Sequence, residues 1–332
     1  MRIVPAEWQK QRAVLMAFPH KNSDWNSDLN SALVPFIRTA QAIAYAQPIY
    51  IICDNKDDIS ALFCSTRNMS FIEIATNDTW IRDFGYISVV EEGEVKLLDF
   101  DFNAWGEKFA FELDNEVNKK LHKKGYMGVT PLETIDFVLE GGSIESDGLG
   151  TIMTTTACLC NPNRNGGLSK DEVKEKLKEY LGAKRVLWLD HGYLAGDDTD
   201  SHVDTLARFV STDTIAYVKC LDKEDEHYDE LQKMEEQLKG FRTLEGDPYS
   251  LFPLPMPKAK YDEEGKRLPA TYANFLITNG ALVYPTYSDE EDKYAHEIFK
   301  ILFADKEIIP IECSRLIEQG GSLHCSTMQI PF

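Results

Sequence analysis

The sequence is short of positive charge. It has 35 lysine and arginine residues against 55 aspartate and glutamate residues, which gives a formal net charge of −20 at pH 7. A protein with this balance lacks the basic surface that binds nucleic-acid phosphates or anionic lipids, so no nucleic-acid partner is expected. The negative electrostatic field of such a protein would attract a cationic substrate. An acidic protein without such a substrate could carry the same charge, so the charge alone does not decide the function.

Long apolar runs are also missing. No stretch approaches the roughly 18 apolar residues that a membrane-spanning helix needs, and residues 1–8 lack the apolar core of a signal peptide. We therefore expect a cytoplasmic protein without a membrane partner. The hydrophobic share of 43% over 332 residues still allows a large buried core, which excludes a disordered chain.

Cysteine is present in an odd number and without paired spacing. Of the seven cysteines, only Cys158 and Cys160 lie close together, and no second pair accompanies them. Disulfide frameworks and cysteine zinc sites both need such pairs, so we expect reduced thiols and no zinc site. Four of the cysteines we interpret as inert side chains: Cys53, Cys64, Cys220 and Cys313.

What the sequence does contain is a repeated unit of two strands, a helix and a third strand. Asp147-Gly148 and Asn279-Gly280 stand between apolar runs, a pattern typical of tight hairpin turns that require positive φ. The predicted hairpins span residues 85–100, 143–156, 205–220 and 275–287.

Helices are predicted between the hairpins. A capping box at Ser169–Glu172 opens an apolar stripe that Gly182 ends, and Ser288–Glu291 is expected to cap a second helix running to Leu302 in the same way. Further helices are predicted over residues 28–46, 112–124 and 225–239. Strands that follow helices are predicted over residues 49–53, 135–139, 186–189 and 308–311.

The two ends of the chain complete the pattern. The last hairpin lacks a second strand after residues 321–330, and the run Ala13–Phe18 could supply it. Repeats that close on themselves form a propeller-like ring, and pairing of the two ends would avoid free sheet edges. Repeats that did not close would form an open sheet.

Polar residues stand at the start of successive hairpins. The five segments are residues 78–83, 140–143, 202–204, 272–275 and 320–325. In a ring of repeats these equivalent positions would meet at the axis, bringing together a cysteine, a histidine and several carboxylates. A cysteine with a histidine elsewhere in the chain is a candidate nucleophile and acid–base pair, and paired carboxylates suit a guanidinium group.

Other interpretations remain open for several of these residues. His202 could be a structural histidine, Trp80 and Trp105 could be core residues, and Gly141-Gly142 could be a simple bulge. Asp200, His202 and Asp204 alternate as in the manganese motif of the metal-dependent ureohydrolases. The second aspartate cluster of those enzymes is absent, so only half of such a site is present.

Taken together, the motifs resemble the agmatine deiminases of the guanidino-group-modifying superfamily, related to the bacterial peptidyl-arginine deiminases. The resemblance covers nearly the whole length and rests on these segments: residues 5–8, 16–19, 78–83, 140–142, 147–148, 163–165, 198–209, 272–275 and 320–327. Departures from the usual pattern occur at Tyr86, Ser201 and Gln319.

The resemblance implies one catalytic domain over residues 1–332, folded as a five-bladed α/β propeller of ββαβ repeats with pseudo-fivefold symmetry. It implies hydrolysis of agmatine to N-carbamoylputrescine and ammonia without a metal or cofactor, in putrescine (polyamine) biosynthesis or agmatine catabolism. It assigns Cys325 as the nucleophile forming an amidino-cysteine, His202 as the acid and base, and Asp83 and Asp204 as guanidinium clamps. The implied substrate-binding residues are Trp80, Trp105, Glu140, Asp198 and Asn274.

Three alternatives and the assembly state stay open. The substrate could be free or peptidyl arginine, the protein could be a non-catalytic guanidino-binding protein, or it could be a ureohydrolase. Agmatine is favoured because the pocket motifs are acidic and their only cation, Arg82, should point away from Asp83 in an extended segment. His324 should likewise point away from Cys325. A homodimer is compatible with the sequence.

Overall fold

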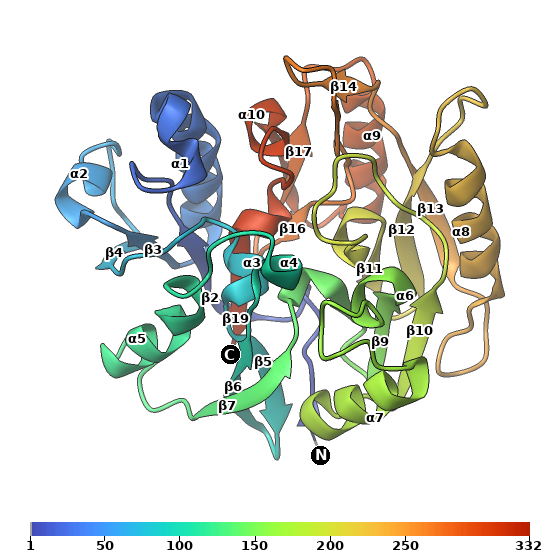
Figure 1. Ribbon diagram of the computed structural model, residues 1–332, viewed down its shortest axis with the longest axis horizontal. Helices are drawn as coiled ribbons and strands as arrows, with labels where there is room; N and C mark the ends of the chain where they lie inside the picture. Colours follow the sequence, from blue (N-terminus) through green and yellow to red (C-terminus); the bar gives the residue numbers. More distant parts are fainter. Residues whose placement is uncertain (1) are drawn as a thin grey trace.

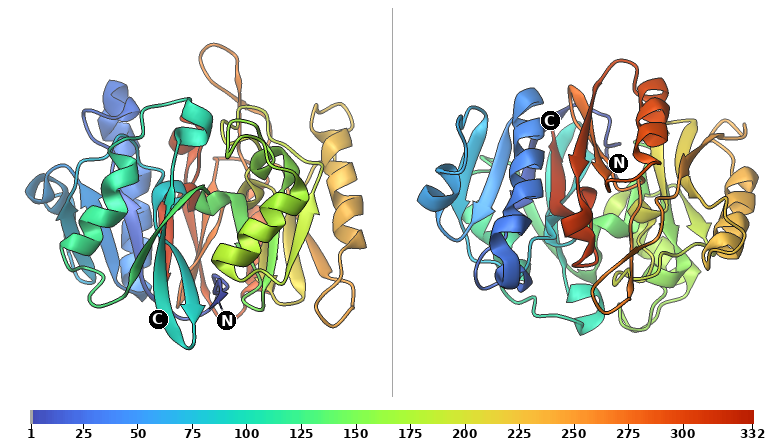
Figure 2. Two further views of the ribbon diagram at one scale, coloured as in Figure 1. Left: turned by 60° about the horizontal axis from the view of Figure 1, so that its bottom comes forward. Right: turned by 90° about the horizontal axis from the view of Figure 1, so that it is seen from above.

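The computed structural model describes residues 2–332 and shows a mixed α/β fold built from several small sheets. The longer helices lie around the periphery of the molecule, and two short ones, α3 (Ile81–Phe84) and α4 (Ala104–Glu107), lie near its middle (Figure 1). Both ends of the chain reach the same side (Figure 2). Within residues 2–332, no helix has the length and apolar character needed to cross a membrane.

Five sheets in the described part of the chain share one arrangement, in which an antiparallel pair is extended by a parallel strand. The first consists of β19 (Thr327–Pro331), β2 (Gln11–Ala17), β3 (Ile49–Cys53) and β4 (Met69–Glu73). The second consists of β1 (Arg2–Ile3), β5 (Ile87–Glu91), β6 (Glu94–Asp101) and β7 (Leu132–Val138).

The remaining three sheets have three strands each. They are β8 (Ile144–Ser146), β9 (Thr151–Thr155) and β10 (Arg185–Leu189); β11 (Ala207–Ser211), β12 (Thr214–Lys219) and β13 (Ser250–Pro255); and β16 (Leu276–Ile277), β17 (Ala281–Thr286) and β18 (Glu307–Glu312). A separate short hairpin pairs β14 (Lys260–Tyr261) with β15 (Arg267–Leu268).

Helices connect the second and third strands of the units. The main ones are α1 (Leu29–Ala46), α5 (Val117–Lys123), α7 (Lys170–Leu181), α8 (Tyr228–Gly240) and α9 (Asp292–Leu302). Shorter helical segments occur in these and other connections: α2 (Lys56–Ser60) between β3 and β4, α10 (Ser314–Ile317) between β18 and β19, α6 (Thr156–Leu159), and the 3₁₀ turns η1 (Asp24–Asp28) and η2 (Asp114–Glu116).

The four predicted hairpins and the pairing of the two ends are confirmed. β19 pairs antiparallel with β2, with Thr327 opposite Met16, so the C-terminal strand supplies the partner of the N-terminal one. The capping box at Ser169 and Glu172 is also confirmed, and Gly182 ends α7 with a left-handed φ of 73°. Val173 and Leu177 on this helix are buried against β5–β9, and each such burial contributes about 1.5–3 kcal/mol.

One prediction about local structure is wrong, and one strand was not predicted. Ser288 does not cap a helix: it has a φ of 50° and its hydroxyl donates to Glu312, while α9 begins at Asp292 behind a turn. The strand β13 was not predicted, because Pro253 and Pro255 interrupt its pattern. Proline is tolerated there because β13 is the edge strand of its sheet.

Candidate active site

Short helical turns, rather than strands, carry the polar segments at the hairpin starts. These turns are α3, η3 (Gly141–Ser143), η4 (Val203–Thr205) and η5 (His324–Ser326). The turn α3 packs against both η3 and η5, and η3 packs against η4. The extended conformation expected around Asp83 is therefore wrong, since the Asp83 N–H donates to the carbonyl of Trp80 and closes a helical turn. The predicted convergence of the segments is present.

Gly142 marks the point at which three predicted residues meet. A Cβ atom on Gly142 would lie 2.7 Å from His202 Nδ1, 2.8 Å from Asp83 Oδ1 and 3.2 Å from Asp204 Oδ2. The Gly142 N–H donates to Asp83 Oδ1 at 2.9 Å. Glycine is required here by close approach of side chains, so the interpretation of Gly141-Gly142 as a simple bulge is wrong.

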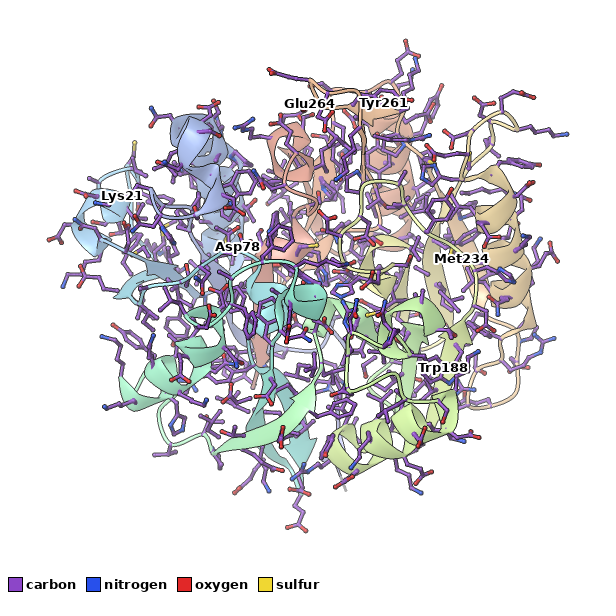
Figure 3. All side chains as sticks on the ribbon, viewed as in Figure 1. Lys21, Asp78, Trp188, Met234, Tyr261 and Glu264 are labelled. Atoms are coloured by element: carbon purple, nitrogen blue, oxygen red, sulfur yellow. The ribbon has the colours of Figure 1, made fainter. Side chains whose placement is uncertain are left out.

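A pocket of about 390 Å³ reaches this cluster at Asp83, whereas His202 and Asp204 are fully buried and are not among its lining residues. Its lining residues are Asp24, Asp78, Trp80, Asp83, Trp105, Phe109, Asp198, Thr199, Gln319, Gly320, Gly321 and Cys325. The lining in the described chain is acidic and aromatic and includes no lysine or arginine. Figure 3 shows Asp78 near the middle of the view, whereas Tyr261 lies at its upper edge.

Cys325 lies in this pocket with its thiol near Asn274. The Cys325 sulfur lies 3.4 Å from Asn274 Oδ1, which also accepts the backbone N–H groups of His324 at 2.9 Å and Cys325 at 3.3 Å. Burial raises the pKa of the Cys325 thiol well above its ordinary value, and the charges of Asp204 and Asp83 raise it further. Asn274 is itself fully buried and outside the pocket lining, so it positions η5 rather than facing the cavity.

Asp83 lines the pocket and also lies next to the buried His202. Its Oδ1 lies 3.6 Å from His202 Nδ1, and its Oδ2 accepts the indole N–H of Trp105 at 3.0 Å. Burial raises the pKa of Asp83 to about 6, and the charge of His202 opposes this rise. Neither ring nitrogen of the fully buried His202 has a hydrogen-bond partner among the described residues, which leaves both able to take part in proton transfer.

Trp105 is held in this position by a left-handed turn. The φ angles of Ala104, Trp105, Gly106 and Glu107 are 47°, 56°, 99° and 62°, a run that L-residues rarely adopt. Asn103 anchors the turn, since its side chain accepts the N–H of Gly106 and donates to the carbonyl of Asn163. Both Trp80 and Trp105 line the pocket, so neither is a core residue only.

A chain of buried ionic contacts lies behind Asp204. His324 Nδ1 lies 2.7 Å from Asp204 Oδ2, and His324 Nε2 lies 2.7 Å from Glu7 Oε2. Arg208 contacts Glu7 at 3.0 Å and also pairs with Glu145. Burial alone would raise the pKa of Asp204, but the hydrogen bond and charge of His324 hold it below its ordinary value. His324 does point away from the pocket, as expected.

Glu140, which was expected to bind substrate, does not line the pocket. It is fully buried and absent from the pocket lining, and its Oε1 pairs with Arg164 Nε at 2.6 Å. Arg164 also binds Asp200 Oδ2 at 2.6 Å and the carbonyl of Thr199. Glu140 therefore supports the segment before His202 instead of lining the cavity.

The alternative metal site at Asp200, His202 and Asp204 is wrong. Asp200 pairs with Arg164 and Lys108, and Asp204 pairs with His324, so the alternating residues face different partners. Positive φ angles at Asp200 and Ser201, followed by η4, break the extended geometry that alternation would need. Across residues 2–332, the one group of potential ligands that lies close together is Glu140, Cys158 and His202.

No arginine reaches the candidate pocket within the described chain. Arg82 donates to Gln329 Oε1 at 2.7 Å and lines a separate cavity of about 630 Å³ on the far side of α3, with Glu7 and Glu145. That larger cavity contains neither Cys325 nor Asp83, so the smaller one is the candidate site. The prediction that Arg82 points away from Asp83 is confirmed. The two side chains diverge on a helical turn, however, and not on the extended strand that was expected.

The three departures from the family pattern have separate settings. Gln319 lines the pocket and its amide lies 3.4 Å from the carbonyl of Asp24. Ser201 has a φ of 68°, a left-handed conformation that glycine adopts at no steric cost and that serine rarely adopts. Tyr86 is buried, and its hydroxyl donates to the carbonyl of Asn118, away from the pocket.

Sequence reasoning gave no role to several residues that support the site. Glu7, Arg164 and His324 lie within the quoted motifs, yet their partners are far away in sequence: Glu7 and His324 are 317 positions apart. Asp197 was also missed; it accepts the N–H groups of Thr199 and Ser201 and shapes the loop before His202. A signal was available only for Glu7 and His324, which stand inside otherwise apolar or glycine-rich motifs.

Comparison with known proteins gives consistent matches. A family model described as Porphyromonas-type peptidyl-arginine deiminase matches residues 3–331. An agmatine deiminase from Pseudomonas aeruginosa is 30% identical, covering 99% of this chain and 95% of that protein. A solved C. jejuni agmatine deiminase, a cysteine-to-serine variant with substrate bound, is 42% identical with a TM-score of 0.94, covering 100% of this chain and 97% of that one. DDAH from Pseudomonas aeruginosa, at 10% identity and a TM-score of 0.52, covers 97% of this chain and all of that one and shares the fold alone.

Proposed function

The chain belongs to the Porphyromonas-type peptidyl-arginine deiminase family, and we propose that it hydrolyses agmatine to N-carbamoylputrescine and ammonia. Its relatives named agmatine deiminase support an enzyme that acts on a guanidino C–N bond. The observation that carries the proposal is the meeting of Asp83, His202 and Asp204 around Gly142, beside a pocket that contains Cys325. The product, a ureido amine, would be consumed by a reaction that releases putrescine.

We also propose that the five sheets are the blades of one closed α/β propeller with pseudo-fivefold symmetry, and that residues 1–332 form a single catalytic domain. The shared strand order and the pairing of β19 with β2 support this arrangement. Its functional consequence is that the turn at the start of each unit points to a common centre, where the polar residues collect.

Substrate binding would begin with the two carboxylates. A planar guanidinium offers paired N–H donors, and Asp204 Oδ1 is a buried acceptor without a hydrogen-bond partner in the described chain. Asp83 would accept from the other side, with Trp105 holding its second oxygen. Binding a cation between them would offset the two charges that raise the pKa of the Cys325 thiol, which favours the thiolate at the moment it is needed.

In the first chemical step, the Cys325 thiolate would attack the central guanidinium carbon and form a C–S bond. His202 would give a proton to one terminal nitrogen as its C–N bond breaks, and ammonia would leave. The enzyme would then carry an amidino-cysteine. His202 is suited to this role because it is buried beside Asp83 and its ring nitrogens are not committed to other hydrogen bonds.

In the second step, His202 would take a proton from water as the oxygen attacks the same carbon. The C–S bond would break, Cys325 would leave as the thiolate, and the hydroxyl group of the released product would lose its remaining proton to solvent, which gives the neutral ureido product. Each step moves one proton through His202, so the cycle returns both residues to their starting state. The cysteine-to-serine variant of the C. jejuni agmatine deiminase, solved with substrate bound, is consistent with a cysteine needed for turnover rather than for binding.

The pocket favours agmatine over arginine. Asp24, Asp78 and Asp198 line it beyond Cys325, and an amine-bearing chain could place its ammonium among them. An α-carboxylate in the same place would meet these acids without a lining cation, and burying a charge without a partner is costly. The ammonium group of Lys108 is already bound to Asp200 and to the carbonyl of Asp198, a pocket-lining residue.

The direct test is an assay of purified protein with agmatine and with arginine, following both ammonia and the ureido product. We expect equimolar ammonia and N-carbamoylputrescine from agmatine. Release of urea, or faster turnover of arginine, would contradict the proposed function.

A further inference from the structure

We propose that Glu140, Cys158 and His202 form an inhibitory binding site for a thiophilic divalent cation such as Zn²⁺. One potential ligand atom from each residue lies within 4.8 Å of the other two. A carboxylate oxygen, a thiolate and an imidazole nitrogen are the three protein ligand types that zinc takes. Three protein ligands leave the fourth tetrahedral position open to water.

The three candidate ligands are buried, and each of Glu140 and His202 has at least one polar atom without a partner, although the other oxygen of Glu140 pairs with Arg164. Glu140, Cys158 and His202 are all fully buried. Glu140 Oε2 and both ring nitrogens of His202 have no hydrogen-bond partner among the described residues. Buried polar atoms are normally paired, so this set of unpaired polar atoms in one place points to a ligand.

The local backbone fixes the three side chains from different elements. Cys158 lies in α6, where its N–H donates to Thr155 Oγ1, and Glu140 directly precedes η3. His202 precedes η4, and its N–H donates to Thr199 Oγ1. A site assembled on three separate short turns is already ordered before an ion arrives, which lowers the entropic cost of binding.

The charge around the site favours a dication. Arg164 is the cation in contact with Glu140, and it is shared with Asp200. Asp83 and Asp204 lie on the other side of His202, so carboxylates outnumber the guanidinium. Burial raises the pKa of the Cys158 thiol, but metal coordination would release its proton to solvent and form the metal–sulfur bond.

The inhibitory effect rests on the proposed function, whereas binding does not. A metal ion on His202 would occupy the ring nitrogen that the proposed mechanism needs for proton transfer. Cys325 is outside this ligand group and is held by Asn274 instead. The metal would therefore act as a reversible inhibitor and not as a participant in deimination.

Binding can be measured without any activity, using Co²⁺ as a spectroscopic probe. The background is the full-length chain carrying Cys325→Ser, which removes the other thiol near the pocket, stripped of metal with EDTA. We expect Co²⁺ to produce a thiolate-to-cobalt charge-transfer band in this protein. Adding Cys158→Ala should abolish the band and weaken Co²⁺ binding by at least about 100-fold, beyond the loss typical of removing an outer-shell partner.

A matched control is Cys53→Ala in the same background, because Cys53 is another buried thiol but lies on β3. This variant should keep the band. In otherwise wild-type protein, Zn²⁺ should inhibit ammonia release, EDTA should restore it, and Cys158→Ala should raise the inhibitory Zn²⁺ concentration by the same factor.

Two outcomes would overturn the proposal. One is the absence of a charge-transfer band in the Cys325→Ser protein. The other is a band and an affinity that are unchanged by Cys158→Ala. A band that depends on Cys158 in a protein inactive on agmatine would support the metal site and contradict only the proposed function.

Discussion

Asp204 Oδ2 and His324 Nδ1 lie 2.7 Å apart, although His324 immediately precedes the proposed nucleophile and points away from its pocket. Through its other ring nitrogen, His324 also contacts Glu7, so the imidazole links Asp204, the candidate guanidinium clamp, to Glu7. It makes His324 a positioning residue: it touches neither the pocket nor the proposed reacting atoms, but it helps to keep Asp204 ionised.

The first prediction concerns this contact. Burial alone would raise the pKa of Asp204, and His324 opposes that rise. We expect His324→Gln to raise the pKa of Asp204 and so to shift the acidic limb of the kcat/KM profile for agmatine to higher pH. The loss of activity should be larger at pH 6 than at pH 8.

The control for this variant is His227→Gln. His227 is also buried and lies 2.7 Å from a carboxylate, that of Asp225, but its partners are not in the site. A parallel loss at all pH values in His324→Gln, or the same shift in His227→Gln, would show that His324 has only a structural role.

The second prediction concerns Asp83 in the free enzyme. Its pKa is raised to about 6 because burial outweighs the favourable charge of His202. Below that pH the carboxyl is protonated and has lost the charge that a guanidinium requires. We expect kcat/KM for agmatine to fall as the pH drops through about 6, because kcat/KM reports ionisations of the free enzyme. A profile that stays flat down to pH 5 would contradict this assignment.

The third prediction concerns substrate choice. We expect a kcat/KM preference for agmatine over arginine of at least about 10³, on the scale of one unpaired buried charge at roughly 1.4 kcal/mol per tenfold. Asp198→Asn removes one acid from the pocket lining and should narrow the preference by roughly tenfold.

Asp229→Asn, at an exposed acid on α8, is the matched control and should leave the preference unchanged. Comparable turnover of agmatine and arginine by the wild-type protein would show that a basic side chain reaches the pocket during the reaction.

The fourth prediction separates deimination from metal-dependent ureohydrolysis. Ammonia release from agmatine should survive exhaustive EDTA treatment, because the proposed chemistry uses Cys325 and His202 alone. Iodoacetamide should inactivate the enzyme. Loss of activity with EDTA, rescue by Mn²⁺ and urea as the product would instead restore the metal-dependent alternative.

Much of the fold could be predicted because its signals are local. The capping box at Ser169 and the Asp147-Gly148 turn involve residues within a few positions of one another, and both are present. Ser288 shows the limit of such signals. Its sequence context matches a capping box, yet Tyr287 and Asp289 donate their N–H groups to Asp292, and the helix begins later.

The site could be predicted in part for a similar reason. Equivalent positions in the repeats indicated the segments that contain Asp83, His202, Asp204 and Cys325, and the family resemblance assigned their roles; the structure brings these segments together. The sequence could not show that Glu140 would form an ion pair with Arg164, because that contact depends on how two loops pack against each other. For the same reason, the link from Glu7 through His324 to Asp204 emerges only in the folded chain.

The central claim is that Cys325 forms a covalent bond to the guanidino carbon, and trapping that adduct tests it most directly. The wild-type enzyme would be quenched in acid during steady-state turnover of agmatine, and its peptides would be weighed by mass spectrometry, with Cys325→Ser protein treated in parallel. We expect the peptide that contains Cys325 to gain the mass of agmatine less ammonia, and the serine variant to gain nothing and to lose at least about 10³-fold in kcat. Rapid ammonia release by the Cys325→Ser protein, or an adduct on a different residue of the wild type, would contradict the mechanism.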